Sequence, residues 1–272
     1  MGVEIEPAER LESIRLKFAW AARQAAELEA AIDGFIATAD YTLNLQIDHP
    51  WSSLVLSKVP PVPTDIRLLF ADHVHNLRSV LDHLVWHLVD LNLRDRSPGR
   101  YVAFPVLTDA SDWGDARKRQ LRGFPERWLE VIEWAQPFTM DPPSDHPAYY
   151  LHHLDVASKH HLLVGFGLTL AAIAHPEIRT NRSLGPFDRI MVEDLPGPFD
   201  LKEGEVLRRY RPVSLFDDLR ITGVGQAGQS QIVLGPYRDD VAFPGAAPMK
   251  NRNYVVYVGS VLEALVPAFQ GA

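Results

Sequence analysis

The sequence contains no cysteine and no segment suited to crossing a membrane. Without cysteine there can be no disulfide, thiolate-bound zinc, iron–sulfur cluster or cysteine nucleophile, so any metal would need His, Asp or Glu ligands. The longest apolar run, 162–174, has 13 residues and is too short to span a bilayer. Residues 1–10 are polar and acidic, unlike a signal peptide. We therefore expect a soluble, cytoplasmic protein.

The formal net charge of −8 disfavours non-specific binding of nucleic acid over the whole surface, but it is compatible with a local basic patch. Two short basic runs, 117–122 and 208–211, are candidates for such a patch, although runs of this kind are more often solvated faces. The 272 residues, 46% of them apolar, suffice for one large domain or for a core with an appendage.

Apolar residues recur at alternating spacings of three and four in long segments, which predicts helices that pack lengthwise. Shorter apolar segments alternate with polar residues or lie between Gly and Pro, which predicts strands. The expected long helices are 7–38, 65–92, 147–161 and 252–268, with shorter ones near 109–120 and 125–135. The expected strands are 41–48 and 51–59, as a hairpin, then 162–174, 187–194, 204–212 and 229–234.

The fold class that we expect is therefore α+β, mainly a helical bundle with a β-hairpin after the first helix and a β-rich segment in the C-terminal half. We divide the chain into a bundle with the inserted hairpin (1–162), the β-rich segment (163–250) and a C-terminal helix that returns to the bundle (251–272). The Gly-x-Gly-x-x-Gly spacing at 223–228 precedes a strand rather than a helix. It predicts a hairpin loop and no dinucleotide site.

The second long helix has an unusual polar side. Its residues at intervals of three or four are Asp72, His75, Ser79, His83, Trp86 and Asp90, flanked by Asn76, Asp82 and His87. A solvated face would be rich in Lys and Glu, which this helix lacks after its first turn, so we expect a second, partly buried interface. In the 147–161 helix, His153 and His160 share one face, while His152, Asp155 and Lys159 share another. Such polar layers can be purely structural and fix the register of two helices.

Two segments, DHVHNLRSVLDHLVWHL at 72–88 and LHHLDVASKHHLL at 151–163, resemble signatures of a group of uncharacterised bacterial proteins. In that group an Asn-Leu-Arg-Ser-x-Leu-Asp-His segment precedes an Asp-Lys-His segment. Ser158 stands where the pattern usually has Asp. The resemblance marks a family and implies almost nothing about function.

Arg78 and His83 match the Arg-x(4–6)-His motif of the HEPN superfamily, whose helical bundles include metal-independent ribonucleases. The resemblance implies a HEPN-like endoribonuclease in which His83 acts as general base or acid at the ribose 2′-hydroxyl and Arg78 stabilises the phosphate. Asp82 and Asn76 complete the expected catalytic set. We expect Lys159, His160, His75 and Ser79 to contact phosphate or substrate, with RNA as partner and no cofactor.

Two alternatives remain open. His83 and His87, one helical turn apart, have the spacing of a chelating pair, and Asp72, His153 and His160 could complete the shell of a divalent transition metal in a metal-binding protein or hydrolase. The other alternative is a non-enzymatic interaction protein whose polar layer is structural. In each case the matching seams of the helices make a homodimer an additional expectation.

Overall fold

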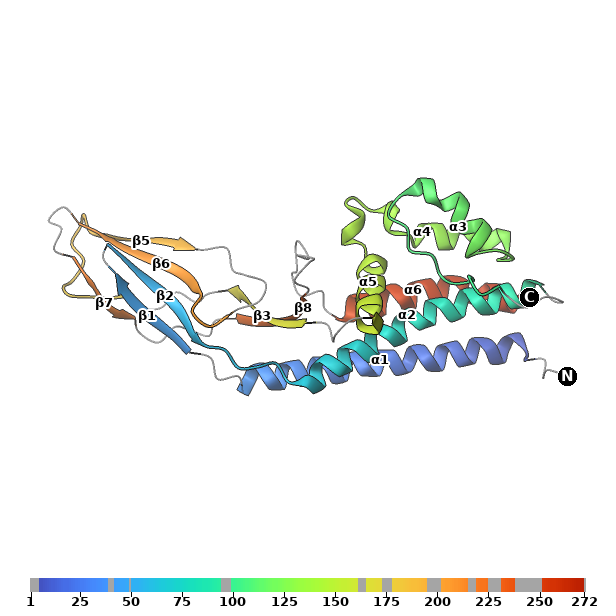
Figure 1. Ribbon diagram of the computed structural model, residues 1–272, viewed down its shortest axis with the longest axis horizontal. Coiled ribbons are helices and arrows are strands. Elements are labelled where there is room, and N and C mark those ends of the chain that lie inside the picture. Colours follow the sequence, from blue (N-terminus) through green and yellow to red (C-terminus); the bar gives the residue numbers. More distant parts are fainter. Residues whose placement is uncertain are drawn as a thin grey trace. The chain divides into compact units, whose positions relative to one another are not determined.

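The structure is a computed structural model that describes residues 5–38, 42–48, 50–93, 99–160, 165–172, 178–194, 202–214, 219–224, 231–237 and 251–271. It confirms the α+β fold with a hairpin directly after the first helix (Figure 1). The chain divides into two compact units. A helical unit comprises Met1–Ala31, Thr64–Val164 and Met249–Ala272, and a β-rich unit comprises Ile32–Pro63 and Gly165–Pro248.

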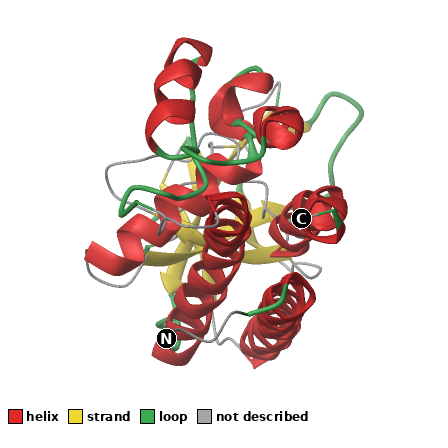
Figure 2. Cartoon of the chain, turned by 90° about the vertical axis from the view of Figure 1, so that its right-hand side faces the viewer, coloured by secondary structure: helices red, strands yellow, loops and turns green. Residues whose placement is uncertain are grey.

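The helical unit is organised around α2 (Thr64–Leu93), which packs against α5 (Pro147–His160) and α6 (Asn251–Gln270). The first part of α1 (Pro7–Thr38) also lies against α2. Figure 2 shows several helices of the chain in end-on view. Leucine and valine at the predicted three-and-four spacing form the buried seam of α2, which is the reason that this segment is helical. The short α3 (Trp113–Arg119) and α4 (Leu129–Trp134) follow α2 in the chain.

In the β-rich unit, the hairpin strands β1 (Thr42–Asp48) and β2 (Trp51–Lys58) belong to an antiparallel sheet of four strands. Its order is β1-β2-β6-β5, with β6 (Val206–Val213) in the interior and β5 (Arg189–Asp194) at one edge. Two pairs complete the unit: β3 (Gly165–Ala172) with β8 (Gln231–Tyr237), and β4 (Ile178–Thr180) with β7 (Ile221–Val224). Leu54, Tyr210 and Ile221 form a buried cluster against which Leu43, Leu45, Ile178 and Ile190 pack.

The hairpin belongs to the β-rich unit, whereas the sequence predicts it as part of the helical bundle. The reason is strand pairing, because β2 pairs with β6, which places Ser53 opposite Arg209. Strands β4 and β7 are too short to give a periodic signal, so the sequence reading did not include them. Gly223 lies within β7, and residues 225–228 of the expected loop lie outside the described residues.

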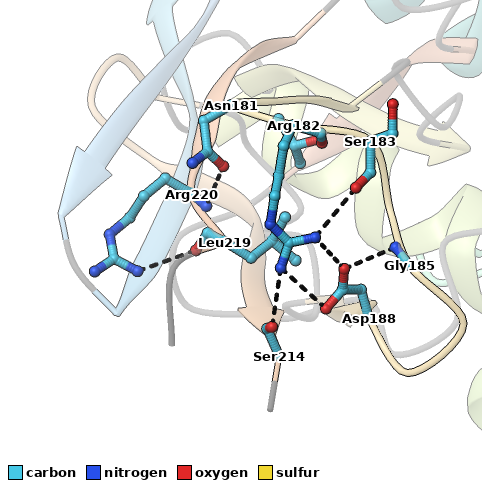
Figure 3. Close-up of polar contacts among 9 residues, drawn as sticks. Asn181, Arg182, Ser183, Gly185, Asp188, Ser214, Leu219 and Arg220 are labelled. Atoms are coloured by element: carbon cyan, nitrogen blue, oxygen red, sulfur yellow. Dashed lines mark hydrogen bonds and ion pairs between the residues drawn. The ribbon is translucent and has the colours of Figure 1, made fainter. Parts of the chain in front are cut away.

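A network of polar contacts fixes the turn between β4 and β5 (Figure 3). The Arg182 guanidinium pairs with the Asp188 carboxylate and donates to Ser214 Oγ at 3.0 Å. The backbone N–H of Gly185 donates to the same carboxylate at 2.7 Å. Hydrogen bonds from Arg182 and from Gly185 hold the pKa of Asp188 well below its usual range. The chain therefore enters β5 from an anchored turn.

Among the described residues, no helix combines the length and the apolar character that a membrane span requires.

Candidate functional site

The most chemically suggestive group of side chains lies where α2 meets α5. Asp155 of α5 is 4% exposed and accepts hydrogen bonds from two cation-forming groups. His75 of α2 lies with Nδ1 3.0 Å from Asp155 Oδ1, and Lys159 Nζ lies 2.7 Å from Oδ2. Lys159 stands one helical turn after Asp155, the spacing at which two side chains of a helix meet. A buried carboxylate is thereby paired on both of its oxygens.

The pairing determines how His75 presents itself. An ionised carboxylate can only accept, so Nδ1 carries the proton and Nε2 of the neutral ring is the acceptor. The His75 side chain is 49% exposed, and Nε2 makes no hydrogen bond within the described part of the chain. The result is an imidazole that is oriented by a buried carboxylate and available to an incoming group. This is the relation that a general base needs.

His152 and Arg78 extend this group on the buried side. Burial lowers the pKa of His152 to about 4, and the positive charge of Arg78 is the next cause. His153 and Lys159 lower the pKa further, whereas Asp155 opposes them. His152 is therefore neutral at neutral pH, and the cause is in part a positive local field. We call His75, Arg78, His152, Asp155 and Lys159 the α2–α5 cluster.

Arg78 is held in place rather than presented to solvent. Its side chain is 7% exposed, and Nη2 lies 2.7 Å from the carbonyl oxygen of Phe104 and 2.9 Å from Asp82 Oδ1. Asp82 also accepts from the backbone N–H of Phe104 at 3.0 Å. Both residues thus anchor the segment that follows α2. Nη1 of Arg78 is buried with no hydrogen-bond partner among the described residues.

His83 lies among other neighbours. It is exposed, and its ring stands edge-on to that of His87, with the centroids 6.0 Å apart. Burial and then the Lys17 ammonium lower the pKa of His83. Within the described residues no contact joins His83 to Arg78, because five helical positions turn the two side chains about 140° apart. Arg78 and His83, the two members of the expected motif, therefore lie in different surroundings and do not form one site.

Three further residues of α2 that we expected in a site have these positions. Asn76 Nδ2 donates to Gln24 Oε1 of α1 at 2.9 Å, which makes Asn76 part of the α1–α2 contact. Ser79 is half-buried on α2, one turn after His75, and Asp72 is exposed. The side chain of His160, the last residue of α5, lies outside what the structure describes.

The expected metal ligands do not converge in the part of the chain that is described. No group of three or more His, Asp or Glu side chains there could hold a metal ion. His87 Nδ1 lies 3.4 Å from the Arg10 guanidinium, which also pairs with Asp90. Burial, followed by Arg10, lowers the pKa of His87 to about 4. On α5, the His153 ring packs against Tyr149 with centroids 4.2 Å apart.

The basic run at 117–122 lines a hollow of about 450 Å³ between α3 and α4. Its lining combines the basic Arg117, Lys118 and Arg122 with the apolar Leu121, Phe124 and Leu129. Arg117 also pairs with Glu126. Gly123, with φ of +87°, closes against Leu93 at the end of α2. Since α2 rises about 1.5 Å per residue, Leu93 is roughly 27 Å from His75 along the helix. The hollow is therefore separate from the α2–α5 cluster.

The sequence places His152, Asp155 and Lys159 on one face of a helix, but only Lys159 is among the substrate contacts that it predicts. The signal that could have found Asp155 is that it is an acidic residue among the apolar and histidine positions of α5, one turn before a lysine. No protein-family model matches the chain, and neither a curated protein nor a solved structure matches it.

Proposed function

We propose that the protein is a cytoplasmic, metal-independent endoribonuclease, with the α2–α5 cluster as its active site. The observation that carries the proposal is the hydrogen bond between the buried Asp155 carboxylate and the half-exposed His75 ring, with Lys159 on the other carboxylate oxygen. This arrangement supplies an oriented base and a cation side by side. RNA cleavage through the ribose 2′-hydroxyl requires both and needs no metal.

The step follows from the position of each group. His75 Nε2 takes the proton of the 2′-hydroxyl, the 2′-oxygen bonds to phosphorus, and the bond from phosphorus to the 5′-oxygen breaks. A solvent water protonates the leaving 5′-oxygen, and the imidazolium then returns its proton to the hydroxide. The negative charge of the Asp155 carboxylate stabilises the imidazolium that forms, as the aspartate of a Ser-His-Asp triad does. Lys159 stabilises the charge on the phosphoryl oxygens. The products are a 2′,3′-cyclic phosphate and a 5′-hydroxyl.

An anionic substrate fits the electrostatics of the cluster. Besides burial, Arg78 is the largest electrostatic cause that lowers the pKa of His152, and Asp155 opposes it only in part, which supports a positive field at that ring. A phosphate near the ring would be attracted by this field. Arg78 contributes from a buried position and through its hold on Phe104, so its role in the proposal is positioning.

The proposal keeps the RNA substrate that the HEPN resemblance implies, and it moves the proton transfer from His83 to His75. The two versions are separable by mutation. His75→Asn, which removes Nε2 and keeps a hydrogen-bond donor near Asp155, should lower cleavage of a single-stranded RNA by about 10²–10⁴-fold. His83→Asn should leave cleavage unchanged, because His83 lies outside the α2–α5 cluster. Reactions are run with EDTA, and the products are resolved on a gel.

One further variant and one substrate control complete this test. Asp155→Asn keeps the size of the side chain but removes its charge, and we expect it to slow cleavage with little change in KM. The same RNA with a single 2′-deoxy residue at the cleaved position should resist. If cleavage persists in His75→Asn and is lost in His83→Asn, the general base is His83, as the HEPN resemblance implies. Cleavage that requires a divalent cation would overturn the metal-independent mechanism.

The rival function is a non-enzymatic interaction protein, in which the same contacts only fix the packing of α5 on α2. That function predicts a lower melting temperature for Asp155→Asn and no cleavage of any RNA by the wild-type chain. We also propose that the protein is a homodimer.

A further inference from the structure

The β5 strand is an edge of the four-stranded sheet, with charged residues toward its ends and exposed apolar residues in its centre. Its only ladder partner among the described strands is β6 (Figure 1). An edge strand has a row of backbone N–H and C=O groups that can pair with another chain, and proteins commonly block it with charge, proline or a bulge. In β5 the central residues, Met191 and Val192, are apolar and each 45% exposed. The register of β5 on β6 is regular from Arg189 to Asp194.

The other edge of the sheet, β1, shows what an ordinary edge looks like in this protein. Thr42, Asn44, Gln46 and Asp48 give it a polar side, and β7 lies beside it. Its pairing with β2 also contains an irregularity near Thr42. These features discourage pairing with a further strand. Of the two edges of this four-stranded sheet, β5 is the one whose described ladder is regular over its whole length and whose two central residues are both apolar.

We propose that β5 pairs antiparallel with β5 of a second copy of this chain, with the two-fold axis at Met191. A two-fold axis perpendicular to a continuous sheet places each residue opposite one on the same side of the sheet. In this register the two Met191 side chains meet, Arg189 faces the partner's Glu193, and Ile190 faces the partner's Val192. The pairing joins the two four-stranded sheets into one.

Charge and polarity both favour a second copy as the occupant. Arg189 and Glu193 lie on the same side of the strand, two residues on either side of Met191, so antiparallel self-pairing brings unlike charges together twice. Within its own sheet Arg189 lies opposite Val213 and Glu193 lies opposite Arg209 of β6, so Arg189 has no acidic residue opposite it there. On the opposite side, Ile190 packs against the cluster of Leu54, Tyr210 and Ile221. The partner's Ile190 would cover the exposed Val192 and extend this apolar face.

The strand is also prepared for pairing by its surroundings. The Arg182–Asp188 network anchors the turn that leads into β5 (Figure 3). Ladder bonds to β6 then hold the strand extended over its whole length. Little conformational entropy therefore remains to be lost when a second strand adds to this edge.

The absence of cysteine from the natural chain permits a direct test of the register. A residue on the two-fold axis lies opposite itself, with a Cα separation of about 4.5–5.5 Å, which is within the range of a disulfide. Met191→Cys should therefore cross-link the full-length chain into a covalent dimer under mild oxidation. Ile47→Cys, at a 49% exposed position on β1, is the matched control and should cross-link much more slowly. Equal cross-linking rates for the two variants would overturn the proposal.

Exchanging the charges of Arg189 and Glu193 tests the same register without a covalent cross-link. Light scattering over a concentration series should give wild-type masses that rise from 30.6 kDa toward twice that value. Arg189→Glu, which lies opposite Val213 within its own chain, should weaken dimerisation about tenfold or more. The double variant R189E/E193R should restore it. A wild-type chain that stays monomeric throughout the series, or a dimer that Arg189→Glu leaves unchanged, would overturn the proposal, whatever other surface or peptide β5 then binds.

Discussion

Two sides of α2 carry the same kinds of polar residue and use them differently. Toward α1, His73 is fully buried and its Nδ1 lies 3.0 Å from the Ala21 carbonyl oxygen, while Asn76 bonds to Gln24. Toward α5, His75 bonds to a buried carboxylate but keeps half of its surface in solvent. The difference between these two histidines, two residues apart, is access. A polar side chain that is covered can only fix the packing, whereas one that is held and exposed can also act on a ligand.

The largest expected effect, on the side of α2 that faces α1, is the contribution of His73 to the pH dependence of stability. Burial lowers the pKa of His73 to about 4 in the folded state, below its ordinary value of 6.5. Since protonation then favours the unfolded chain, the stabilisation from a neutral His73 is complete above pH 6.5. It is lost as the pH falls toward 4, by about 3 kcal/mol.

Urea unfolding at pH 7 and pH 4.5 measures this loss. His73→Asn keeps a donor near the Ala21 carbonyl but does not titrate, so its stability should fall less between the two pH values. His75→Asn provides the control, because it changes a half-exposed histidine on the same helix. Equal pH dependence in wild type and His73→Asn would mean that His73 is not the group that destabilises the fold in acid.

A smaller effect is expected from the α1–α2 hydrogen bond. Asn76→Ala should lower the free energy of unfolding by about 1 kcal/mol, because it removes one part-buried hydrogen bond. The same variant should cleave RNA at the wild-type rate. A double-mutant cycle with Gln24→Ala checks that the loss belongs to this pair. A loss of cleavage with unchanged stability would instead place Asn76 in the active site.

The smallest effect concerns His87. Arg10 lies beside its ring and is a cause of its lowered pKa, second to burial. Arg10→Gln should raise the pKa of His87 from about 4 toward its ordinary value, which an NMR titration of the ring can follow. An unchanged pKa would attribute the whole shift to burial.

The sequence predicted the long helices well because their apolar spacing is a local property. The boundaries of α1, α2 and α5 lie within one residue of those expected, and α6 extends the expected helix by two residues at its end. Pairing between distant strands is not local, so the sequence could not show that the hairpin pairs with β6 or that β4 and β7 exist. Strands of three or four residues contain too few positions to show a period.

The sequence indicated only in part which polar side chains lie together. The sequence placed His75 and Lys159 among substrate contacts, and the structure brings both to the same carboxylate. It could not show which face of α2 meets α5, because a stripe of polar residues on a helix does not identify its neighbour. Asp82 and Asn76 illustrate the consequence, since each contacts a different segment, Phe104 and α1 respectively. The spacing of residues in the sequence therefore says less about which side chains meet than the packing of the helices does.

The helical unit is assembled from segments that are far apart in the chain. α6 follows the whole β-rich unit in sequence, yet it packs on α2 and α5, and its Tyr257 hydroxyl donates to the Ala135 carbonyl oxygen. During synthesis, which runs from the N-terminus, α1, α2 and α5 leave the ribosome long before the helix that covers them. The second segment of the β-rich unit, Gly165–Pro248, must therefore be made before the apolar seam of α2 can pack against α6. In a growing chain this exposed seam is a natural binding site for chaperones.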